Sequence, residues 1–294
     1  MRILILGATG MLGHKLIQEF RKTDEVIATA RGSIWPDTND VRIIQFWASD
    51  AGEFKDVLEA SKPDVVINCI GVIKQLGGAK DPLVCVPINS LFPHQISKAC
   101  QENGVKFVHV STDCVFSGRL GRPYTEEDVP DPTDLYGRTK LVGEAGLTLR
   151  TSIIGRETKG TTGLIEWFLS QKGKTIKGFS KALYTGFTTI EFARVIRAAL
   201  TANLAHGVYQ ASSDPISKFD LLNLAKEKFG IEVDIKDDEK FECDRRLDSS
   251  RFRRLTAYSP PTWNDMLAEM ASDPTPYEEW RKNANRLVQH GYKF

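Results

Sequence analysis

The chain has 294 residues, of which 41% are hydrophobic and 26% charged, and its 39 basic and 38 acidic side chains leave a net charge of +1. This length suits a full dinucleotide-binding domain with a smaller second lobe. The near balance of charge argues against a polyanion-binding surface, so we expect no nucleic-acid partner. No apolar run approaches the roughly 18 residues that span a bilayer, so we expect no membrane segment.

The cysteines favour a reducing compartment. Five cysteines, an odd number, occur without a Cys-x-x-Cys pair and without histidine at ligand spacing. Such cysteines are typical of free thiols rather than of disulfides or metal ligands, so we expect a cytoplasmic location and no metal site.

The first residues resemble a nucleotide-binding turn. The apolar run Arg2–Leu6 leads into Gly7, Gly10 and Gly13, and the apolar spacing after them is helical. A strand, a tight turn and a helix are the context of a dinucleotide fingerprint. Its glycines allow the turn, the approach of a pyrophosphate and close helix packing. An ordinary βα turn or a secretory signal are the alternatives, but the glycines interrupt the apolar run too early for a signal. The predicted cofactor contacts are Gly7, Thr9, Gly10, Met11, Leu12 and Gly13.

The second strand, Val26–Ala30, indicates which nicotinamide cofactor binds. No Asp or Glu lies between Val26 and Ser33, where an NAD enzyme places an acid on the ribose. Arg31 instead offers a guanidinium for a 2′-phosphate, with Ser33 as a second donor. We therefore predict NADPH, with NADH as the alternative; an ordinary surface role for Arg31 also stays open.

Alternating strands and helices predict the fold class. Strands are expected at 42–46, 64–68, 105–111 and around 147–154, separated by helices at 54–60, 93–103 and 136–145. This alternation predicts an α/β protein with a Rossmann-type doubly wound parallel sheet. We expect a dinucleotide-binding domain over 1–160, with a return segment near 186–212. A smaller C-terminal α/β substrate lobe is expected over 161–294, and the region around Trp280 is expected to be a surface tail.

A phenol, an ammonium and a hydroxyl suggest the chemistry. Tyr136 and Lys140 lie four positions apart in the sequence, and residues at this spacing share one face of a helix. A phenol titrates near 10 and a nearby cation favours the phenolate. With Thr112 they form a proton-transfer set for a carbonyl/alcohol redox step. A lone Tyr-x-x-x-Lys pattern is common by chance. A catalytic role for this one therefore depends on the nucleotide-binding glycine turn in the same chain.

Polar residues follow the fourth and fifth strands, where parallel sheets bind ligands at strand carboxyl ends. We predict that Asn68, Cys69, Gly71 and Ser111 contact the cofactor. Asn89, near the start of the next helix, has two interpretations. It either makes a structural hydrogen bond or belongs to a water relay towards Lys140.

Taken together, these motifs resemble the extended short-chain dehydrogenase/reductase superfamily. The blocks 111–118 and 136–144 are similar to those of dTDP-4-dehydrorhamnose reductases. The resemblance implies reduction of the C4 ketone of a nucleotide-linked 6-deoxy sugar for polysaccharide precursors. It also implies that Tyr136 donates the proton to the alkoxide, and that Lys140 lowers the pKa of Tyr136 and holds the nicotinamide ribose. Thr112 would hydrogen-bond the carbonyl oxygen.

Three departures from that family concern the substrate. Cys114 stands where the reductases usually have tyrosine, and Trp47 occupies the usual place of an aspartate, although Asp50 follows. Lys74 and Gln75 lie in a stretch that is alanine-rich in the reductases. These departures favour a relative that acts on another nucleotide sugar.

An arginine cluster near residue 250 is either a solvated surface or a source of guanidiniums for a substrate diphosphate. Its members are Arg245, Arg246, Arg251, Arg253 and Arg254. The predicted substrate contacts are Lys74, Asp113 and Arg251.

Two other functions fit the same resemblance. An epimerase or dehydratase of this fold usually retains NAD, which Arg31 disfavours. The regulatory subunit of methionine adenosyltransferase resembles the same reductases without being an enzyme, and co-purification of a synthetase would indicate that role. The resemblance is also compatible with a homodimer.

Overall fold

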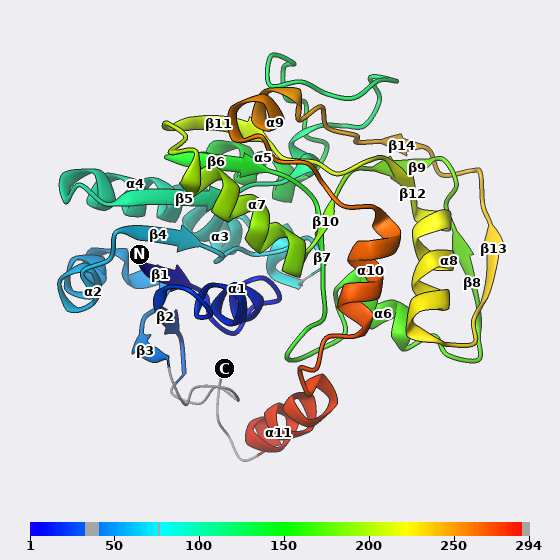
Figure 1. The fold of residues 1–294 in the computed structure, drawn as a ribbon, viewed down its shortest axis with the longest axis horizontal. Coiled ribbons are helices and arrows are strands. Elements are labelled where there is room, and N and C mark those ends of the chain that lie inside the picture. Colours follow the sequence, from blue (N-terminus) through cyan, green and yellow to red (C-terminus); the bar gives the residue numbers. More distant parts are fainter. Residues whose placement is uncertain (33–40, 76, 290–294) are drawn as a thin grey trace.

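The protein was analysed as a computed structural model that describes residues 1–32, 41–75 and 77–289. Within them lies a seven-stranded sheet in the order β11-β6-β5-β4-β1-β2-β3 (Figure 1). All neighbouring strands are parallel. The predicted parallel sheet is therefore confirmed. Its strands are β1 (Arg2–Leu6), β2 (Glu25–Ala30), β3 (Arg42–Gln45), β4 (Val65–Asn68), β5 (Lys106–Val110), β6 (Leu147–Arg150) and β11 (Gly207–Gln210).

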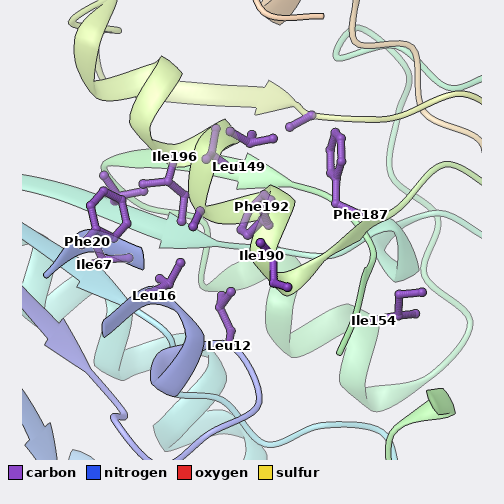
Figure 2. Close-up of a cluster of buried hydrophobic side chains, with 14 of the residues drawn as sticks. Leu12, Leu16, Phe20, Ile67, Leu149, Ile154, Phe187, Ile190, Phe192 and Ile196 are labelled. Carbon is purple, nitrogen blue, oxygen red and sulfur yellow. The ribbon is translucent and has the colours of Figure 1, made fainter. Parts of the chain in front are cut away.

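Helices cover both faces of this sheet. Alternate residues of a strand point to opposite faces, so each strand contributes to two separate buried clusters. Ile3 and Ile5 of β1 belong to one buried cluster, and Leu4 and Leu6 belong to another. The first cluster contains side chains of α1 (Gly13–Phe20) and α7 (Thr189–Thr201), and Figure 2 shows them meeting Ile67 and Leu149 of the sheet. The second contains side chains of α2 (Phe54–Ser61) and α4 (Phe92–Glu102). The sheet is thus doubly wound, as predicted.

The segment before α4 is helical over a longer stretch than expected. It runs through η2 (Gly77–Lys80), α3 (Pro82–Cys85) and a π-helical turn, η3 (Val86–Leu91), directly into α4. A proline at 87 and another at 93 lie near the starts of η3 and α4. Because proline has no backbone N–H, the continuous helix lacks an internal hydrogen bond at each of these positions.

The predicted strand 147–154 divides into two. β6 stays in the main sheet, whereas β7 (Ile153–Ile154) pairs with β10 (Phe187–Thr188) and leads into a second lobe, at the right of Figure 1. There, β12-β9-β14 and β13-β8 form two small sheets. The lobe consists of α6 (Leu164–Leu169), β8 (Thr175–Gly178), β9 (Ala182–Tyr184), β12 (Ile216–Ser217), α8 (Lys218–Phe229), β13 (Asp234–Asp237) and β14 (Cys243–Asp244). Helices α9 (Ser250–Thr256) and α10 (Trp263–Ala271) follow.

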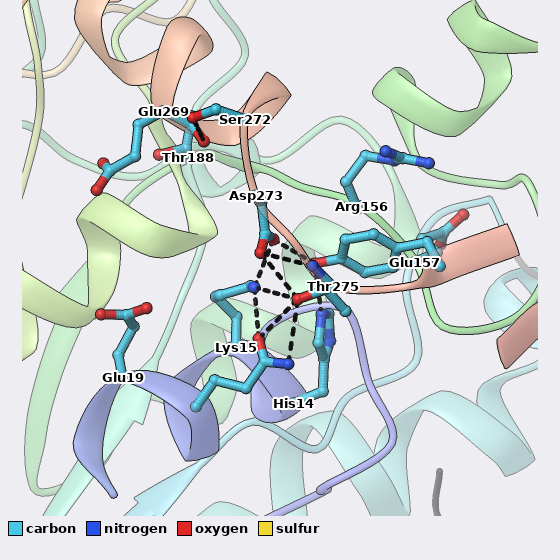
Figure 3. A network of polar contacts seen from close by, with 12 residues as sticks. His14, Lys15, Glu19, Arg156, Glu157, Thr188, Glu269, Ser272, Asp273 and Thr275 are labelled. Carbon is cyan, nitrogen blue, oxygen red and sulfur yellow. Dashed lines mark hydrogen bonds and ion pairs between the residues drawn. The ribbon is translucent and has the colours of Figure 1, made fainter. Parts of the chain in front are cut away.

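The expectation of a surface tail around Trp280 is wrong. Residues Tyr277–Gln289 form helix α11, in which Tyr277 is 1% and Trp280 is 5% exposed. Both rings pack edge-on against His14 of α1. A buried polar network joins the same two segments (Figure 3), in which Lys15 of α1 pairs with Asp273 at 2.5 Å. Residues 273–280 are therefore fixed to the helix that follows the glycine turn.

The part of the chain that the structure describes contains no helix long and apolar enough to cross a membrane.

Candidate active site

A cavity of about 700 Å³ opens at the carboxyl ends of the sheet strands. It lies where β1 and β4 are neighbours although β2 follows β1 in the chain, and such switch points are the usual ligand crevices of open α/β sheets. Residues of the glycine turn, of the ends of β4 and β5 and of the Tyr136 helix line it, together with residues of the second lobe. The volume is within the range of cofactor and substrate sites.

The glycine turn has the shape that the sequence predicts. Gly7 adopts a φ of +89°, which L side chains rarely tolerate. A side chain at Gly13 would place its Cβ 2.1 Å from the carbonyl oxygen of Gly7, so α1 can approach β1 only with glycine there. Thr158 of the second lobe donates a hydrogen bond to the carbonyl of Thr9 at 2.9 Å and holds the turn from the other side. The turn residues that line the cavity are Thr9, Gly10, Met11 and Leu12.

Arg31 lies exposed at the end of β2, and Ser33 lies outside the described residues. Lys159 lines the cavity. Burial lowers the pKa of Lys159, and the charge of Arg31 lowers it further. The two cations are therefore close enough to interact, although Arg31 itself is not among the residues that line the cavity, and only Arg31 was expected from the sequence. Their charges suit a phosphate group.

Tyr136 and Thr112 meet because α5 (Leu135–Val142) packs closely on the loop after β5. Asp134 caps α5 by accepting a hydrogen bond from the backbone N–H of Gly137 at 2.8 Å. A side chain at position 137 would lie 2.2 Å from the carbonyl oxygen of Cys114, so glycine permits the approach. Thr112, Tyr136 and Lys140 all line the cavity. The structure thus brings together the three residues that the sequence predicts.

The acidity of Tyr136 differs from the expectation. Burial raises the pKa of its phenol above the usual value, although a hydrogen bond with Thr112 acts in the opposite direction. Lys140 was expected to lower this pKa, but its charge is not one of the main causes of the shift. A phenol that keeps its proton at neutral pH is the form that donates a proton to a carbonyl oxygen.

The Lys140 ammonium donates a hydrogen bond to the carbonyl of Val110 at 2.7 Å and lies 3.4 Å from Nε2 of His109. Burial lowers the pKa of Lys140 to about 8. His109 is fully buried, and its Nδ1 lies 3.1 Å from the side-chain nitrogen of Asn68. Sequence reasoning missed His109, because its position in the middle of an apolar strand suggested only a core residue. Asn68 was predicted as a cofactor contact, and it also accepts a hydrogen bond from the N–H of Ile70 at 2.9 Å.

The other predicted residues at the strand ends divide into two groups. Cys69 and Gly71 line the cavity with their neighbours. Ser111 also lines it, but its hydroxyl donates to Glu144 at 2.7 Å.

Asn89 is buried, and its side chain makes hydrogen bonds with both backbone groups of Val72 and with the hydroxyl of a threonine. These contacts fit the structural interpretation of Asn89.

Of the three predicted substrate contacts, two line the cavity and one does not. Asp113 and Lys74 line the cavity, and the Lys74 ammonium pairs with Asp134 at 2.7 Å. Arg251 is not among the lining residues. Its guanidinium lies 4.7 Å from the ring centre of Tyr209 and donates to a backbone carbonyl of β11.

The arginine cluster also divides. Arg246 pairs with Asp244, and Arg253 donates to Ser249 and to the backbone of residue 212. Arg245 alone points towards the site, where it donates to the carbonyl of Phe116 at 2.9 Å and to the sulfur of residue 114 at 3.3 Å. Lys218, in the second lobe, also lines the cavity, and no sequence pattern predicted it.

Comparisons with known proteins agree with this geometry. The family profile described as the RmlD substrate binding domain matches residues 1–156. The chain belongs to this family. A probable low-salt glycan biosynthesis reductase of Haloferax volcanii is 26% identical over 299 residues, with 94% of this chain and 99% of that protein covered.

Other relatives match about half of the chain. A dTDP-4-dehydrorhamnose reductase of Streptomyces griseus is 31% identical over 144 residues, which cover 49% of this chain and 43% of the relative. The beta subunit of methionine adenosyltransferase 2 of Xenopus tropicalis is 31% identical over 144 residues, covering 49% and 41%. In both cases the matched segment spans less than half of the relative.

Solved structures share the fold of this RmlD family member over most of its length. A hypothetical dTDP-4-dehydrorhamnose reductase from Sulfolobus tokodaii superposes with a TM-score of 0.75 at 28% identity, over 90% of this chain and 98% of that one. The Bacillus anthracis dTDP-4-dehydrorhamnose reductase in complex with NADP gives a TM-score of 0.76 at 20% identity, over 92% and 98%. The second likeness supports the fold alone.

Proposed function

We propose that this protein is an NADPH-dependent reductase of the C4 ketone of a nucleotide-linked 6-deoxy sugar, acting in glycan precursor synthesis. The observation that carries the proposal is the placement of Thr112, Tyr136 and Lys140 on the wall of the cavity that the glycine turn also lines. The reductase names of the relatives point to the same reaction.

The residues of the cavity suit a nicotinamide dinucleotide. The glycine turn leaves room for a pyrophosphate, and Arg31 and Lys159 offer charge for a 2′-phosphate. Lys140 directs one N–H to Val110 and lies within reach of Nε2 of His109, so one N–H is left for the nicotinamide ribose. Within this assignment, residues 1–160 and the return segment bind the cofactor, and residues 161–294 bind the substrate. The cofactor, when bound, supplies the hydride.

The side chains of this protein supply the proton and hold the carbonyl. Tyr136 starts as a neutral phenol and gives its proton to the carbonyl oxygen as negative charge develops there. The hydroxyl of Thr112 donates a hydrogen bond to the same oxygen and stabilises that charge. Thr112 is buried and Tyr136 is half-buried, and the limited access of water strengthens these interactions.

A screen of NADPH oxidation tests the proposal directly. The purified protein is mixed with NADPH and with a panel of dTDP- and UDP-linked 4-keto-6-deoxy sugars, and absorbance at the nicotinamide band is followed. Consumption of NADPH with at least one member is expected, with NADH slower. If no member of the panel is reduced, the proposal fails.

A regulatory role is the second candidate, since the methionine adenosyltransferase subunit is as similar to about half of this chain as the Streptomyces griseus reductase is. The presence of Tyr136, Lys140 and Thr112 in one cavity favours the enzyme. Affinity purification from the native cell separates the two roles. A methionine adenosyltransferase catalytic subunit bound in stoichiometric amount would indicate regulation.

We also propose a cytoplasmic homodimer. The compartment is supported by the five free thiols. The dimer is supported by an apolar face on α3, η3 and α5, where Leu83, Val86, Leu91 and Val142 are 84%, 45%, 53% and 63% exposed. Large apolar side chains that share an exposed face mark protein interfaces. Light scattering should give twice the chain mass, and Val142→Glu should yield monomers. Val129→Glu, at a more exposed loop position, should stay dimeric.

A further inference from the structure

Lys218 is the one lysine of helix α8 that lines the cavity, and the structure of the second lobe fixes its position there. It is the first residue of α8, which Ser217 caps by accepting a hydrogen bond from the N–H of Asp220 at 3.0 Å. Strand β12 ends at Ser217 and pairs with β9, with Ile216 opposite Tyr184. The Lys218 ammonium lies 3.6 Å from the centre of the Tyr184 ring. This cation–π contact holds the ammonium in place before any ligand binds.

The donors of Lys218 are not used by the protein. Within residues 1–32, 41–75 and 77–289, no hydrogen-bond acceptor or ion-pair partner meets its ammonium, and the Tyr184 ring is the contact that it makes. The hydroxyl of Tyr184 is buried and also lacks a partner in these ranges. Burial lowers the pKa of Lys218 to about 8. A half-buried ammonium without an acceptor costs free energy, which a ligand oxygen would recover.

Asp113 supplies an acceptor beside this donor. Its side chain is 8% exposed and lines the same cavity. The hydroxyl of Thr112 donates to it at 3.3 Å, a long hydrogen bond that leaves most of its acceptor capacity open. Asp113 and Lys218 line the same cavity. Burial raises the pKa of Asp113, and the charges of Arg245 and Lys218 act against that rise. Arg245 is itself engaged with Phe116 and the sulfur of residue 114.

We propose that Lys218 and Asp113 together bind a hydroxyl group on the sugar carbon next to the reacting carbonyl, and so select which sugar nucleotides are reduced. This inference rests on the proposed function, because Thr112 and Tyr136 place the carbonyl oxygen next to Asp113. A hydroxyl donates one hydrogen bond and accepts others, which matches a carboxylate beside an ammonium. In a 6-deoxy sugar the carbon on the other side of the carbonyl carries a methyl group. A methyl group needs neither the ammonium nor the carboxylate. A diphosphate fits less well, since it would meet the negative charge of Asp113.

The first experiment compares two substrates in the intact enzyme. They are dTDP-4-keto-6-deoxyglucose and its 3-deoxy analogue, which lacks the hydroxyl. Lys218→Met should lower kcat/KM for the hydroxylated substrate by roughly 10- to 100-fold, the effect of one hydrogen bond to a charged group. The value for the 3-deoxy analogue and the KM for NADPH should stay near wild type. Lys177→Met, an exposed position on β8 whose lysine pairs with Asp238, is the control and should change neither. Equal losses for the two substrates would overturn the proposal.

The second experiment does not depend on turnover. Calorimetric titration with dTDP-rhamnose and with dTDP alone compares wild type and Lys218→Met. The variant should bind dTDP-rhamnose more weakly by a similar factor and dTDP as tightly as wild type. Equal weakening of both ligands would mean that the ammonium meets the diphosphate, and unchanged binding of both would mean that it meets neither; either result overturns the proposal. If the wild-type enzyme oxidises no NADPH, that result would contradict the proposed function and not the role of Lys218 in binding the sugar.

Discussion

Two buried polar clusters of this protein differ in how completely the chain satisfies them. The anchor cluster consists of His14, Lys15, Gln18, Asp273, Thr275 and Tyr277 (Figure 3). The catalytic cluster consists of Thr112, Asp113, Tyr136, Lys140 and Lys218. In the anchor cluster the buried ammonium has a carboxylate at 2.5 Å. In the catalytic cluster two lysines have pKa values of about 8, and neither forms a close ion pair within the described residues.

The difference separates stability from function. A closed network of opposite charges can stabilise the fold, whereas opening it leaves a buried charge uncompensated. An open set of buried donors and acceptors costs free energy until a ligand completes it, and shifted pKa values of this kind gather at functional sites. We therefore expect substitutions in the catalytic cluster to impair turnover with little effect on unfolding, and substitutions in the anchor cluster to do the reverse.

The largest effect is expected from Tyr136→Phe. The variant keeps the ring packing but removes the proton donor, so turnover should fall by about 10² to 10⁴, the usual contribution of a positioned acid. Cofactor affinity and the melting temperature should change little. Single-turnover kinetics and thermal unfolding measure the two quantities. Tyr209→Phe, whose ring lies under Arg251, is the matched control. Turnover near wild type would exclude Tyr136 as the acid.

In the anchor cluster, Lys15→Met should destabilise the fold. The Lys15 and Asp273 side chains are 3% and 7% exposed, and removing one partner of a buried pair costs about 3–5 kcal/mol. The free energy of unfolding from denaturant titration is the measurement. Lys22→Met removes an ammonium from the same segment that is 63% exposed and pairs with Glu19, and should cost at most about 1 kcal/mol. Equal losses in the two variants would show that the anchor cluster adds no stability.

The same comparison explains what could be predicted from the sequence. The glycine turn and the spacing of Tyr136 and Lys140 are local patterns, since each depends on the backbone geometry of one turn or one helix. The parallel sheet followed from the alternation of strands and helices. These features were therefore readable without knowing which distant residues meet.

The missed residues depend on long-range contacts. Lys218 reaches the cavity only because β12 pairs with β9 and places the start of α8 there. His109 lies under Lys140 because β5 and α5 pack together, and a histidine within an apolar strand does not reveal that neighbour. Tyr277 and Trp280 are two aromatic residues in a polar segment, and the burial of both depends on His14, which is 263 residues from Tyr277.

Arg31→Ala sharpens the comparison at the cofactor end of the cavity. If the guanidinium binds the 2′-phosphate, NADPH affinity should fall by about 1.5–3 kcal/mol, the range for a hydrogen bond to a charged group. NADH affinity should barely change, because NADH lacks that phosphate. Isothermal titration with both cofactors gives the two values, and Arg42→Ala, at the start of β3, provides a control. Equal losses for NADPH and NADH would assign Arg31 to the fold or the adenine instead.

The smallest expected effect concerns the pH dependence of the anchor cluster. His14 is fully buried, and this burial lowers its pKa from 6.5 to about 4. Its Nδ1 lies 2.9 Å from the carbonyl of Gly10, and its Nε2 lies 3.1 Å from the hydroxyl of Tyr277. The unfolded chain therefore binds a proton between pH 6.5 and 4 that the folded protein does not. Stability from His14 is complete above pH 6.5 and is lost as the pH falls towards 4.

These pKa values predict that the wild-type protein loses about 2 kcal/mol of unfolding free energy through His14 between pH 7 and pH 5. His14→Gln lacks a titrating ring, so its stability should fall by that much less over the same interval. His206→Gln, at an exposed position, should follow the wild-type curve. Denaturant titrations at the two pH values measure all three proteins. The hydroxyl of Tyr277 donates a hydrogen bond to Asp273 at 2.9 Å. The oxygen of that hydroxyl is then an acceptor for Nε2 of His14, which favours the imidazolium form of His14. A His14→Gln variant that loses more stability than wild type on acidification would show that this opposing effect of Asp273 exceeds the cost of burial.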